Sequence, residues 1–389
     1  MNPKTIMIVA GESSGDQHGA HLVAALKKRE ETLTFCGIGG AALKAAGVDI
    51  KVDSAALCVV GITEVFARLP QILNGLKVAK NLLKTRRPDL LILIDFPDFN
   101  LRVAAAARKL NIPVLYYVSP QIWAWRQGRV YKIKRLVDHV AVILPFEETF
   151  YKRFGVPATF VGHPLLDGIG PELGEKPNPM DKDFFTIGLL PGSRHKEVLR
   201  HIPIMLAAAE IVNRRYKSME FLISVAPGID RAMMEEIVAP YRSELKIVLE
   251  TGVVNEVFEK SDLLLSVSGT VTLEATLAAK PLVMIYKVSS LSALVAWAMI
   301  RVKYYSLTNL IADKQVLPEL MQLDANAANI ADHLMELLDD DQKRAEMMEE
   351  MAKIRAALGG VGASARTAEI ALKMITPKPK SGETSGGEQ

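Results

Sequence analysis

Short apolar runs alternate along the chain with segments whose apolar residues recur at helical spacing. In the first part of the chain, the runs rich in Val, Ile and Leu are 5–10, 32–37, 89–94, 113–118, 138–143 and 158–161. Such runs are typical of strands that are buried on both faces of a parallel sheet. The segments between them, for example 16–29 and 99–110, predict helices that cross from one strand to the next. This pattern predicts a doubly wound α/β domain over residues 1–163.

A break rich in proline and glycine at 164–183 lacks apolar periodicity and predicts an interdomain linker. Beyond it, strand-like runs resume at 185–190, 219–225, 245–249, 262–267 and 281–286. Helical patterns again separate these runs, so residues 184–360 predict a second Rossmann-like domain. Domains of this kind bind ligands at the carboxyl ends of their strands, which predicts a central cleft lined by strand-to-helix loops.

The region 325–375 has the pattern of three helices. The last of them, at 361–375, could return to the N-terminal domain or reach a partner subunit, so a homodimer is left open. Residues 376–389 are rich in Lys, Gly, Ser and Glu and predict a disordered tail.

Composition and charge argue against several classes of protein. The net charge of +3 is too small to indicate a nucleic-acid surface. Cys36 and Cys58 have neither metal-ligand nor Cys-x-x-Cys spacing, which argues against a structural zinc site or a disulfide framework. The N-terminus shows no export signal, and no apolar run reaches the roughly 20 residues that a spanning helix needs. We therefore expect a cytoplasmic protein.

The first strand-to-helix loop reads Gly-Glu-Ser-Ser-Gly-Asp at 11–16. Its glycines allow close backbone approach, and free N–H groups at the helix start favour an anionic or hydroxyl-rich ligand. The candidate binding residues are Ser13, Ser14, Gly15 and Asp16. The loop departs from Gly-x-Gly-x-x-Gly and no acid ends the second strand, so a nicotinamide dinucleotide is not expected. A tight turn whose Ser or Asp caps the helix is the alternative.

The second loop, Asp-Phe-Pro-Asp-Phe-Asn at 95–100, follows a strongly apolar strand. An acid at this sheet edge, flanked by Phe96 and Phe99, could have its proton affinity raised enough to act as a general base. Asp98 is the candidate base. The alternative is that Asp98 or Asn100 only caps the next helix.

The third loop contains Ser-Pro-Gln-Ile-Trp-Ala-Trp-Arg at 119–126. The rings of Trp123 and Trp125 could stack on sugar faces, and Arg126 with the basic residues after it could receive a phosphate or an anionic membrane surface. Two packed tryptophans beside a solvated helix face explain the same segment.

Two loops of the second domain have the features of a diphosphate site. Gly192, Ser193 and Arg194 follow a strand and open a helix, where N–H groups and a guanidinium favour phosphate. The second loop, after the run at 262–267, contains Ser268, Gly269, Thr270 and Glu274. Each loop alone is also explained by a helix cap, but their occurrence on one sheet edge favours a nucleotide.

Taken in order, these motifs resemble the lipid A disaccharide synthase family. The motifs that carry the resemblance are those at 11–16, 95–100, 118–126, 144–147, 161–164, 189–194, 268–274, 305–310 and 319–322. The resemblance covers residues 5–370, and the long Trp-Ala-Trp-Arg segment is its most selective part. One departure is Thr308, where the family pattern has Pro before Asn309.

The resemblance implies a GT-B fold and an inverting glycosyltransferase. It would join UDP-2,3-diacylglucosamine to 2,3-diacylglucosamine 1-phosphate, giving a β-1′,6-linked disaccharide and UDP. Asp98 would take the proton of the acceptor 6-hydroxyl, while Arg194 and the two helix starts stabilise departing UDP. Glu274 would hold the ribose, and Asn309 belongs to the donor site by the same resemblance. No cofactor is implied, and no metal ion, because no Asp-x-Asp motif is placed to bridge a diphosphate.

An apolar stripe suggests attachment to the inner-membrane surface of a Gram-negative bacterium. Its residues are Ile62, Val65, Phe66, Leu69, Ile72, Leu73 and Leu76, followed by Lys77, Lys80, Lys84, Arg86 and Arg87. A helix packed on the sheet explains the stripe equally well. The family's substrates carry acyl chains, and an enzyme docked beside the bilayer avoids exposing them to water, so we expect peripheral attachment.

Two other functions are compatible with the same architecture. A UDP-N-acetylglucosamine 2-epimerase would need only one sugar nucleotide. A non-catalytic nucleotide-sugar-binding protein would need only the second domain, and Asp98 would then be merely a helix cap.

Overall fold

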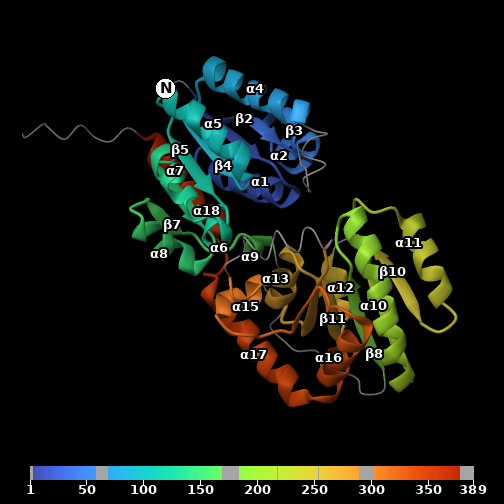
Figure 1. Cartoon of the computed structure of the whole chain (residues 1–389). Helices are drawn as coiled ribbons and strands as arrows, with labels where there is room; N and C mark the ends of the chain where they lie inside the picture. Colours follow the sequence, from blue (N-terminus) through green and yellow to red (C-terminus); the bar gives the residue numbers. More distant parts are fainter. Residues whose placement is uncertain are drawn as a thin grey trace, which may run out of the picture. The chain divides into compact units, whose positions relative to one another are not determined.

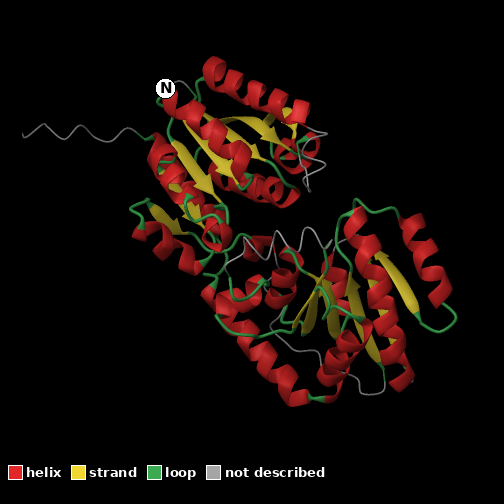
Figure 2. Cartoon of the chain, viewed as in Figure 1, coloured by secondary structure: helices red, strands yellow, loops and turns green. Residues whose placement is uncertain are grey.

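The computed structural model describes residues 3–57, 69–168, 184–216, 218–252, 254–288 and 302–376. The chain forms two compact units (Figure 1). Unit 1 comprises Met1–Asp167 and Val361–Gln389, and unit 2 comprises Gly168–Gly360. Figure 2 shows that strands and helices are interleaved in both units.

Unit 1 is built on a seven-stranded parallel sheet with the order β3-β2-β1-β4-β5-β6-β7. The strands are β1 (Thr5–Ala10), β2 (Thr34–Gly39), β3 (Asp49–Asp53), β4 (Leu90–Ile94), β5 (Val114–Tyr117), β6 (His139–Val142) and β7 (Ala158–Phe160). Helices and short helical turns connect them: α1 (Ser13–Lys27), α2 (Ala41–Ala45), η1 (Ser54–Ala56), α4 (Leu69–Arg86), α5 (Pro97–Lys109), α6 (Ile122–Trp125), α7 (Arg129–Leu136), α8 (Pro145–Arg153) and α9 (Leu165–Gly168).

Helices cover both faces of this sheet (Figure 1). Successive side chains of a strand point to opposite faces. Met7 and Val9 therefore share a core with α4 and α5, whereas Ile6 and Ile8 share a core with α1. Burial on both faces explains why the strands read as uninterrupted apolar runs.

The last described helix, α18 (Ala363–Ile375), packs against α1 within unit 1. Ala368 and Ala371 are fully buried in the same core as the α1 side chains. The carboxylate of Asp167 accepts hydrogen bonds from the backbone N–H groups of Gly362, at 2.6 Å, and Ser364, at 2.9 Å. These contacts fix the start of α18 against the end of the unit's first segment.

Unit 2 is built on a six-stranded parallel sheet with the order β10-β9-β8-β11-β12-β13. The strands are β8 (Phe185–Leu190), β9 (Met219–Val225), β10 (Ile247–Thr251), β11 (Leu263–Val267), β12 (Leu282–Tyr286) and β13 (Glu319–Met321). Its helices are α10 (His195–Arg215), α11 (Arg231–Val238), η2 (Ala239–Tyr241), α12 (Val254–Lys260), α13 (Thr270–Leu277), α15 (Leu307–Ala312), α16 (Ala327–Asp339) and α17 (Asp341–Ala357).

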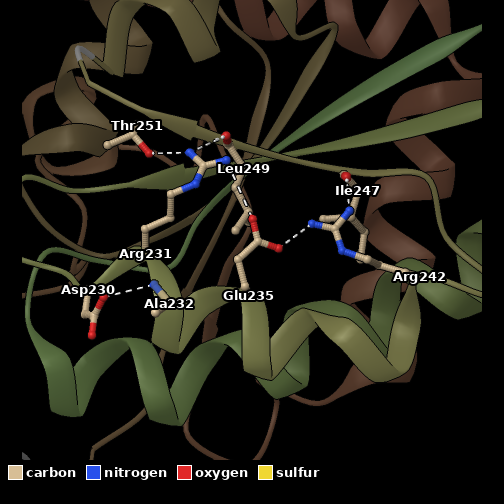
Figure 3. Close-up of polar contacts among 8 residues, drawn as sticks. All are labelled: Asp230, Arg231, Ala232, Glu235, Arg242, Ile247, Leu249 and Thr251. Atoms are coloured by element: carbon tan, nitrogen blue, oxygen red, sulfur yellow. Dashed lines mark hydrogen bonds and ion pairs between the residues drawn. The ribbon is translucent and has the colours of Figure 1, made fainter.

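Two arginines cover the free edge of β10, as Figure 3 shows. Arg231 donates to the carbonyl of Leu249 at 3.3 Å, and Arg242 donates to the carbonyl of Ile247 at 3.0 Å. Glu235 pairs with both guanidinium groups (Figure 3). Occupied edge carbonyls are unavailable to another strand, so this network protects the sheet edge from pairing with a second chain.

The predicted strands are all present, each within two residues of its predicted bounds. The three helices predicted over 325–375 are confirmed as α16, α17 and α18. Two strands were not predicted. β3 alternates apolar with polar residues, as an edge strand does, and β13 has only three residues, so neither produces an apolar run.

Candidate functional site

Each sheet reverses its strand order at one point, and the predicted loops lie there. In unit 1 the order turns between β1 and β4, and in unit 2 between β8 and β11. A switch point of this kind leaves a crevice at the carboxyl edge of a doubly wound sheet. The loops 11–16 and 95–100 flank it in unit 1, while 192–194 and 268–270 flank it in unit 2.

The loops after β1 and β4 approach each other closely. A β-carbon at Gly11 would lie 2.2 Å from Cγ of Phe96, so only glycine fits at this position. Asp95 and Phe96 both have left-handed backbones, with φ of 46° and 48°, and Val118 after the neighbouring strand has φ of 55°. Strained non-glycine residues persist where the surrounding structure holds them, and they cluster at functional sites.

Asn100 is one of the groups that hold this strained turn. Its side-chain amide donates to the carbonyl oxygens of Asp95, at 2.7 Å, and Ile94, at 3.2 Å, and the hydroxyl of Tyr116 donates to the same Asp95 carbonyl at 2.7 Å. Asn100 is fully buried. The side chain braces the β4 turn, and its expected contact with the acceptor stays a prediction.

Asp16 also turns inward, although we expected it to bind a ligand. Its carboxylate accepts from the N–H groups of Gly40, at 2.6 Å, and Ala42, at 2.8 Å. The buried carboxylate therefore caps α2, and not the helix α1 that the alternative interpretation had in view. In the same loop Ser13 is exposed and Ser14 is half-buried, whereas Gly15 is buried and has no side chain to offer.

Asp98 lies at the start of α5 and is the exposed acid of its loop, with 74% of its side chain accessible. Arg129 donates to its Oδ1 at 2.5 Å, and a guanidinium nitrogen of Arg126 lies 3.8 Å from its Oδ2. Two cations face this carboxylate, instead of the apolar enclosure that the flanking phenylalanines suggested. The enclosed acid is Asp95, where burial, with a smaller contribution from Glu12, raises the pKa to about 7.

Trp123 is anchored by a residue that our sequence analysis assigned no role. Its indole N–H donates to Oε1 of the buried Glu147 at 3.0 Å, as does the hydroxyl of Ser119, also at 3.0 Å. The other oxygen, Oε2, accepts from the N–H groups of Ile143 and Leu144. Burial raises the pKa of Glu147, while these hydrogen bonds oppose the shift. The signal in the sequence was a glutamate at the third position of α8, as in a capping box.

Trp125 remains partly open to solvent. The residue is 41% exposed, and the guanidinium carbon of Arg126 lies 4.3 Å from the centroid of its ring. Arg129 lies 5.8 Å from the same ring. Trp125, Arg126 and Arg129, together with Asp98, thus form one cluster at the carboxyl edge of unit 1.

In unit 2 the loop after β8 presents its polar groups to solvent. Gly192 has a left-handed backbone with φ of 110°, and a β-carbon there would strike the side chain of Glu197. Ser193 and Arg194 are exposed at the start of α10. Among the described residues, Arg194 makes only a distant ion pair with Glu197, at 3.9 Å, so its donors remain available to an anion.

The loop after β11 opens α13 in a similar way. Gly269 and Thr270 are exposed and Ser268 is half-buried. Thr272 fixes the turn by donating through its hydroxyl to the carbonyl of Gly269 at 2.8 Å. Burial raises the pKa of Glu274, whose carboxylate has no hydrogen-bond partner among the described residues. A half-buried acid without a partner is suited to accept hydrogen bonds from a hydroxyl-bearing ligand.

Asn309, which we expect in the donor site, is held by hydrogen bonds within unit 2. The residue is fully buried, and its amide nitrogen donates to the carbonyl of Leu317, at 2.9 Å, and to Glu319, at 2.7 Å. Its amide oxygen accepts from the N–H groups of Val316 and Leu317. These hydrogen bonds hold the segment before β13, and ligand contact by Asn309 stays a prediction.

Thr308, the departure from the family pattern, is also buried. Its hydroxyl lies 2.6 Å from the hydroxyl of Thr276 on α13. The hydrogen bond joins α15 to the helix that begins at the candidate donor loop.

Among the residues that the structure describes, no three His, Cys, Asp or Glu side chains gather where they could hold a metal ion. Within the same ranges, no helix is long and apolar enough to span a membrane.

Comparison with known proteins places this chain in a family. The family model described as Lipid-A-disaccharide synthetase matches residues 6–374. The lipid-A-disaccharide synthase of Syntrophus aciditrophicus (strain SB) is 44% identical over 379 residues, which cover 96% of this chain and 99% of that protein. The enzyme of the same name from Geobacter metallireducens is 42% identical over 379 residues, covering 96% and 98%.

Solved structures are similar in fold at low sequence identity. The UDP-GlcNAc 2-epimerase from Neisseria meningitidis bound to UDP-GlcNAc has a TM-score of 0.63 at 15% identity, covering 95% of this chain and 100% of that one. MurG from Acinetobacter baumannii has a TM-score of 0.60 at 17% identity, again covering 95% and 100%.

The two doubly wound units, with polar loops at each switch point, have the GT-B fold. The epimerase shares this fold, so the fold alone does not separate the two activities. The family match does, because it extends over nearly the whole chain. The chain belongs to the lipid-A-disaccharide synthetase family and acts in lipid A biosynthesis.

Proposed function

We propose that the protein transfers 2,3-diacylglucosamine from its UDP derivative to the 6-hydroxyl of 2,3-diacylglucosamine 1-phosphate, with inversion at the anomeric carbon. Unit 2 binds the donor and unit 1 binds the acceptor. The observation that carries this division is the difference between the two switch points. Unit 2 offers exposed residues at two helix starts, including the guanidinium of Arg194, whereas unit 1 offers the exposed carboxylate of Asp98.

In unit 2 the diphosphate of UDP lies against the starts of α10 and α13. Gly192, Ser193 and Arg194 supply donors from one loop, and Ser268, Gly269 and Thr270 supply donors from the other. Helix N-termini and a guanidinium stabilise the negative charge that develops on departing UDP. Glu274, the half-buried acid without a described partner, accepts from the ribose hydroxyls.

In unit 1 the acceptor sugar lies near Ser13, Ser14 and the exposed ring of Trp125. Asp98 takes the proton from the 6-hydroxyl as the oxygen attacks the anomeric carbon of the donor. The bond to UDP breaks on the opposite face of that carbon, so an α-linked donor gives a β-linked product in one displacement. Trp123 acts indirectly, because its N–H is committed to Glu147.

We also propose that α4 attaches the enzyme to the inner membrane, facing the cytoplasm. Leu69 and Leu73 are 41% and 50% exposed on this helix. Ile72 packs against the core and Leu76 is buried in it, so the predicted stripe is only partly available. Ile62, Val65 and Phe66, also predicted, lie outside the described residues. Basic side chains further along α4 are exposed and would attract anionic lipid.

A single assay separates the proposed reaction from its alternatives. The protein is incubated with UDP-2,3-diacylglucosamine and the acylated acceptor phosphate, and the lipids are weighed by mass spectrometry. The proposal predicts a disaccharide monophosphate together with stoichiometric UDP. A UDP-sugar of unchanged mass whose NMR spectrum shows an altered configuration would indicate an epimerase, and binding of UDP without turnover would indicate a non-catalytic protein.

A further inference from the structure

The cluster of Asp98, Trp125, Arg126 and Arg129 holds more positive than negative charge. Both guanidinium groups face the one carboxylate, at 2.5 Å for Arg129 and 3.8 Å for Arg126. The side chain of Arg126 makes no hydrogen bond within the described part of the chain, because its approach to Asp98 is too long for one. The cluster therefore retains one uncompensated positive charge and several unused donors.

The arrangement of these donors suits a phosphate monoester. A guanidinium offers parallel N–H groups that match two oxygens of a phosphate. Trp125 restrains Arg126 through a cation–π contact, with 4.3 Å between the guanidinium carbon and the ring centroid. Arg129 is only 17% exposed, so it is held in place rather than extended into solvent. Two restrained arginines form a preorganised binding site for a compact dianion.

We propose that Arg126 and Arg129 bind the anomeric phosphate of the acceptor sugar, and that this phosphate draws Arg129 away from Asp98. This inference rests on the proposed function, in which Asp98 accepts the proton of the acceptor 6-hydroxyl. In the free protein, Arg129 occupies Oδ1 of that carboxylate. A phosphate dianion competes for the same guanidinium and returns the oxygen to its role as proton acceptor.

Because of this exchange, the phosphate contributes to turnover as well as to affinity. An acceptor without the phosphate would leave Arg129 paired with Asp98, so KM would rise and kcat would fall. Trp125 offers its exposed part to the sugar that carries the phosphate. The cluster thus selects acceptors by charge and activates the base only when the correct acceptor is bound.

The test compares 2,3-diacylglucosamine 1-phosphate with its dephosphorylated counterpart in detergent micelles. We expect wild-type kcat/KM to favour the phosphorylated acceptor by about 10²-fold or more, as for other buried or restrained polar groups that lose their partner. In Arg126→Ala/Arg129→Ala this preference should fall below about tenfold, because each lost charge-assisted contact removes a large part of it. Arg129→Ala alone should raise kcat with the dephosphorylated acceptor, which a merely structural arginine would not do.

Controls keep the interpretation specific. Arg153→Ala removes an exposed arginine of α8 and should leave the preference unchanged. UDP affinity and circular dichroism confirm that each variant is folded. A preference that persists in the folded double variant overturns the inference, whereas failure of the wild type to make a disaccharide from either acceptor overturns the proposed function instead.

Anionic vesicles test whether the cluster binds the phosphate of lipid headgroups instead. Binding to phosphatidylglycerol vesicles should be the same for the wild type and the double variant if the cluster recognises the acceptor. Loss of vesicle binding with an intact acceptor preference would show a membrane contact and contradict the inference.

Discussion

The indole nitrogen of Trp123 and the carboxylate of Glu147 form a hydrogen bond of 3.0 Å that ties the aromatic loop to α8. Glu147 is buried, and every group around its two oxygens is a donor. An ionised carboxylate accepts all of these hydrogen bonds. An amide in its place would turn an N–H group toward other donors.

Glu147→Gln should therefore lower the free energy of unfolding by about 1–3 kcal/mol, the usual cost of an unsatisfied buried polar group. It should also shift the fluorescence of Trp123 to longer wavelength as the indole is released. Urea denaturation followed by fluorescence measures both effects. Glu148→Gln is the matched control, since the neighbouring glutamate makes only a surface ion pair with Lys152. Equal stability of the two variants would show that the four-donor network is unimportant.

Asp95 should make stability fall as the pH rises. Its pKa is raised from 3.8 to about 7 by burial and by Glu12, against a lowering contribution from the N–H of Phe96. Between these values the folded state binds a proton that the unfolded state has lost, so the free energy of unfolding decreases with increasing pH. The full shift corresponds to at most about 4 kcal/mol.

Asp95→Asn removes this titration. Relative to the wild type, the variant should gain stability between pH 5 and pH 8, as measured by chemical denaturation and circular dichroism. Glu31→Gln, at an exposed position, serves as the control. A stability difference between Asp95→Asn and the wild type that is constant over this range would contradict the assignment.

Membrane attachment is tested on the two leucines of α4 that the structure leaves exposed. Leu69→Ser with Leu73→Ser should reduce binding to anionic liposomes by about tenfold or more, since each leucine contributes apolar area to the contact. Folding and activity in detergent should persist. Leu199→Ser removes a comparably exposed leucine of unit 2 and should not affect binding. Unchanged liposome affinity in the first variant would exclude this face of α4.

Donor binding should depend on side chains and helix starts of the protein, without a metal ion. We expect turnover to survive EDTA, because helix starts and Arg194 stabilise the leaving diphosphate. Arg194→Ala and Glu274→Ala should each weaken UDP binding by about 10-fold or more, measured by calorimetry. Arg214→Ala, an exposed arginine at the other end of α10, is the control. Loss of activity on chelation, with recovery on adding Mg²⁺, would contradict the metal-free mechanism.

Much of the fold was readable from the sequence because both sheets are covered by helices on two faces. Strands such as β4 and β8 are buried at every position, so they produce continuous apolar runs. A helix that packs with one face on the sheet does not produce such a run. β3 was missed because an edge strand shares its alternation with many loops. Short β13 carries too few residues to show any period.

The site was predicted less completely, for a physical reason. Sequence motifs locate loops at the carboxyl edge of a sheet, but they do not reveal which polar side chains turn inward. Asp16, Asn100 and Asn309 satisfy backbone groups within the protein, while Asp98 and Arg194 of similar motifs remain exposed. Glu147 was overlooked because its partners come from two loops that only the folded structure brings together.

The most direct test of the mechanism is the turnover of Asp98→Asn. Asparagine preserves the size of the side chain but cannot accept the proton of the 6-hydroxyl. We predict that kcat falls by about 10²- to 10⁴-fold, the usual contribution of a positioned proton acceptor, while the Kd for UDP stays at the wild-type value. A folded Asp98→Asn enzyme that binds UDP normally and turns over at nearly the wild-type rate would contradict the assignment of Asp98 as the base.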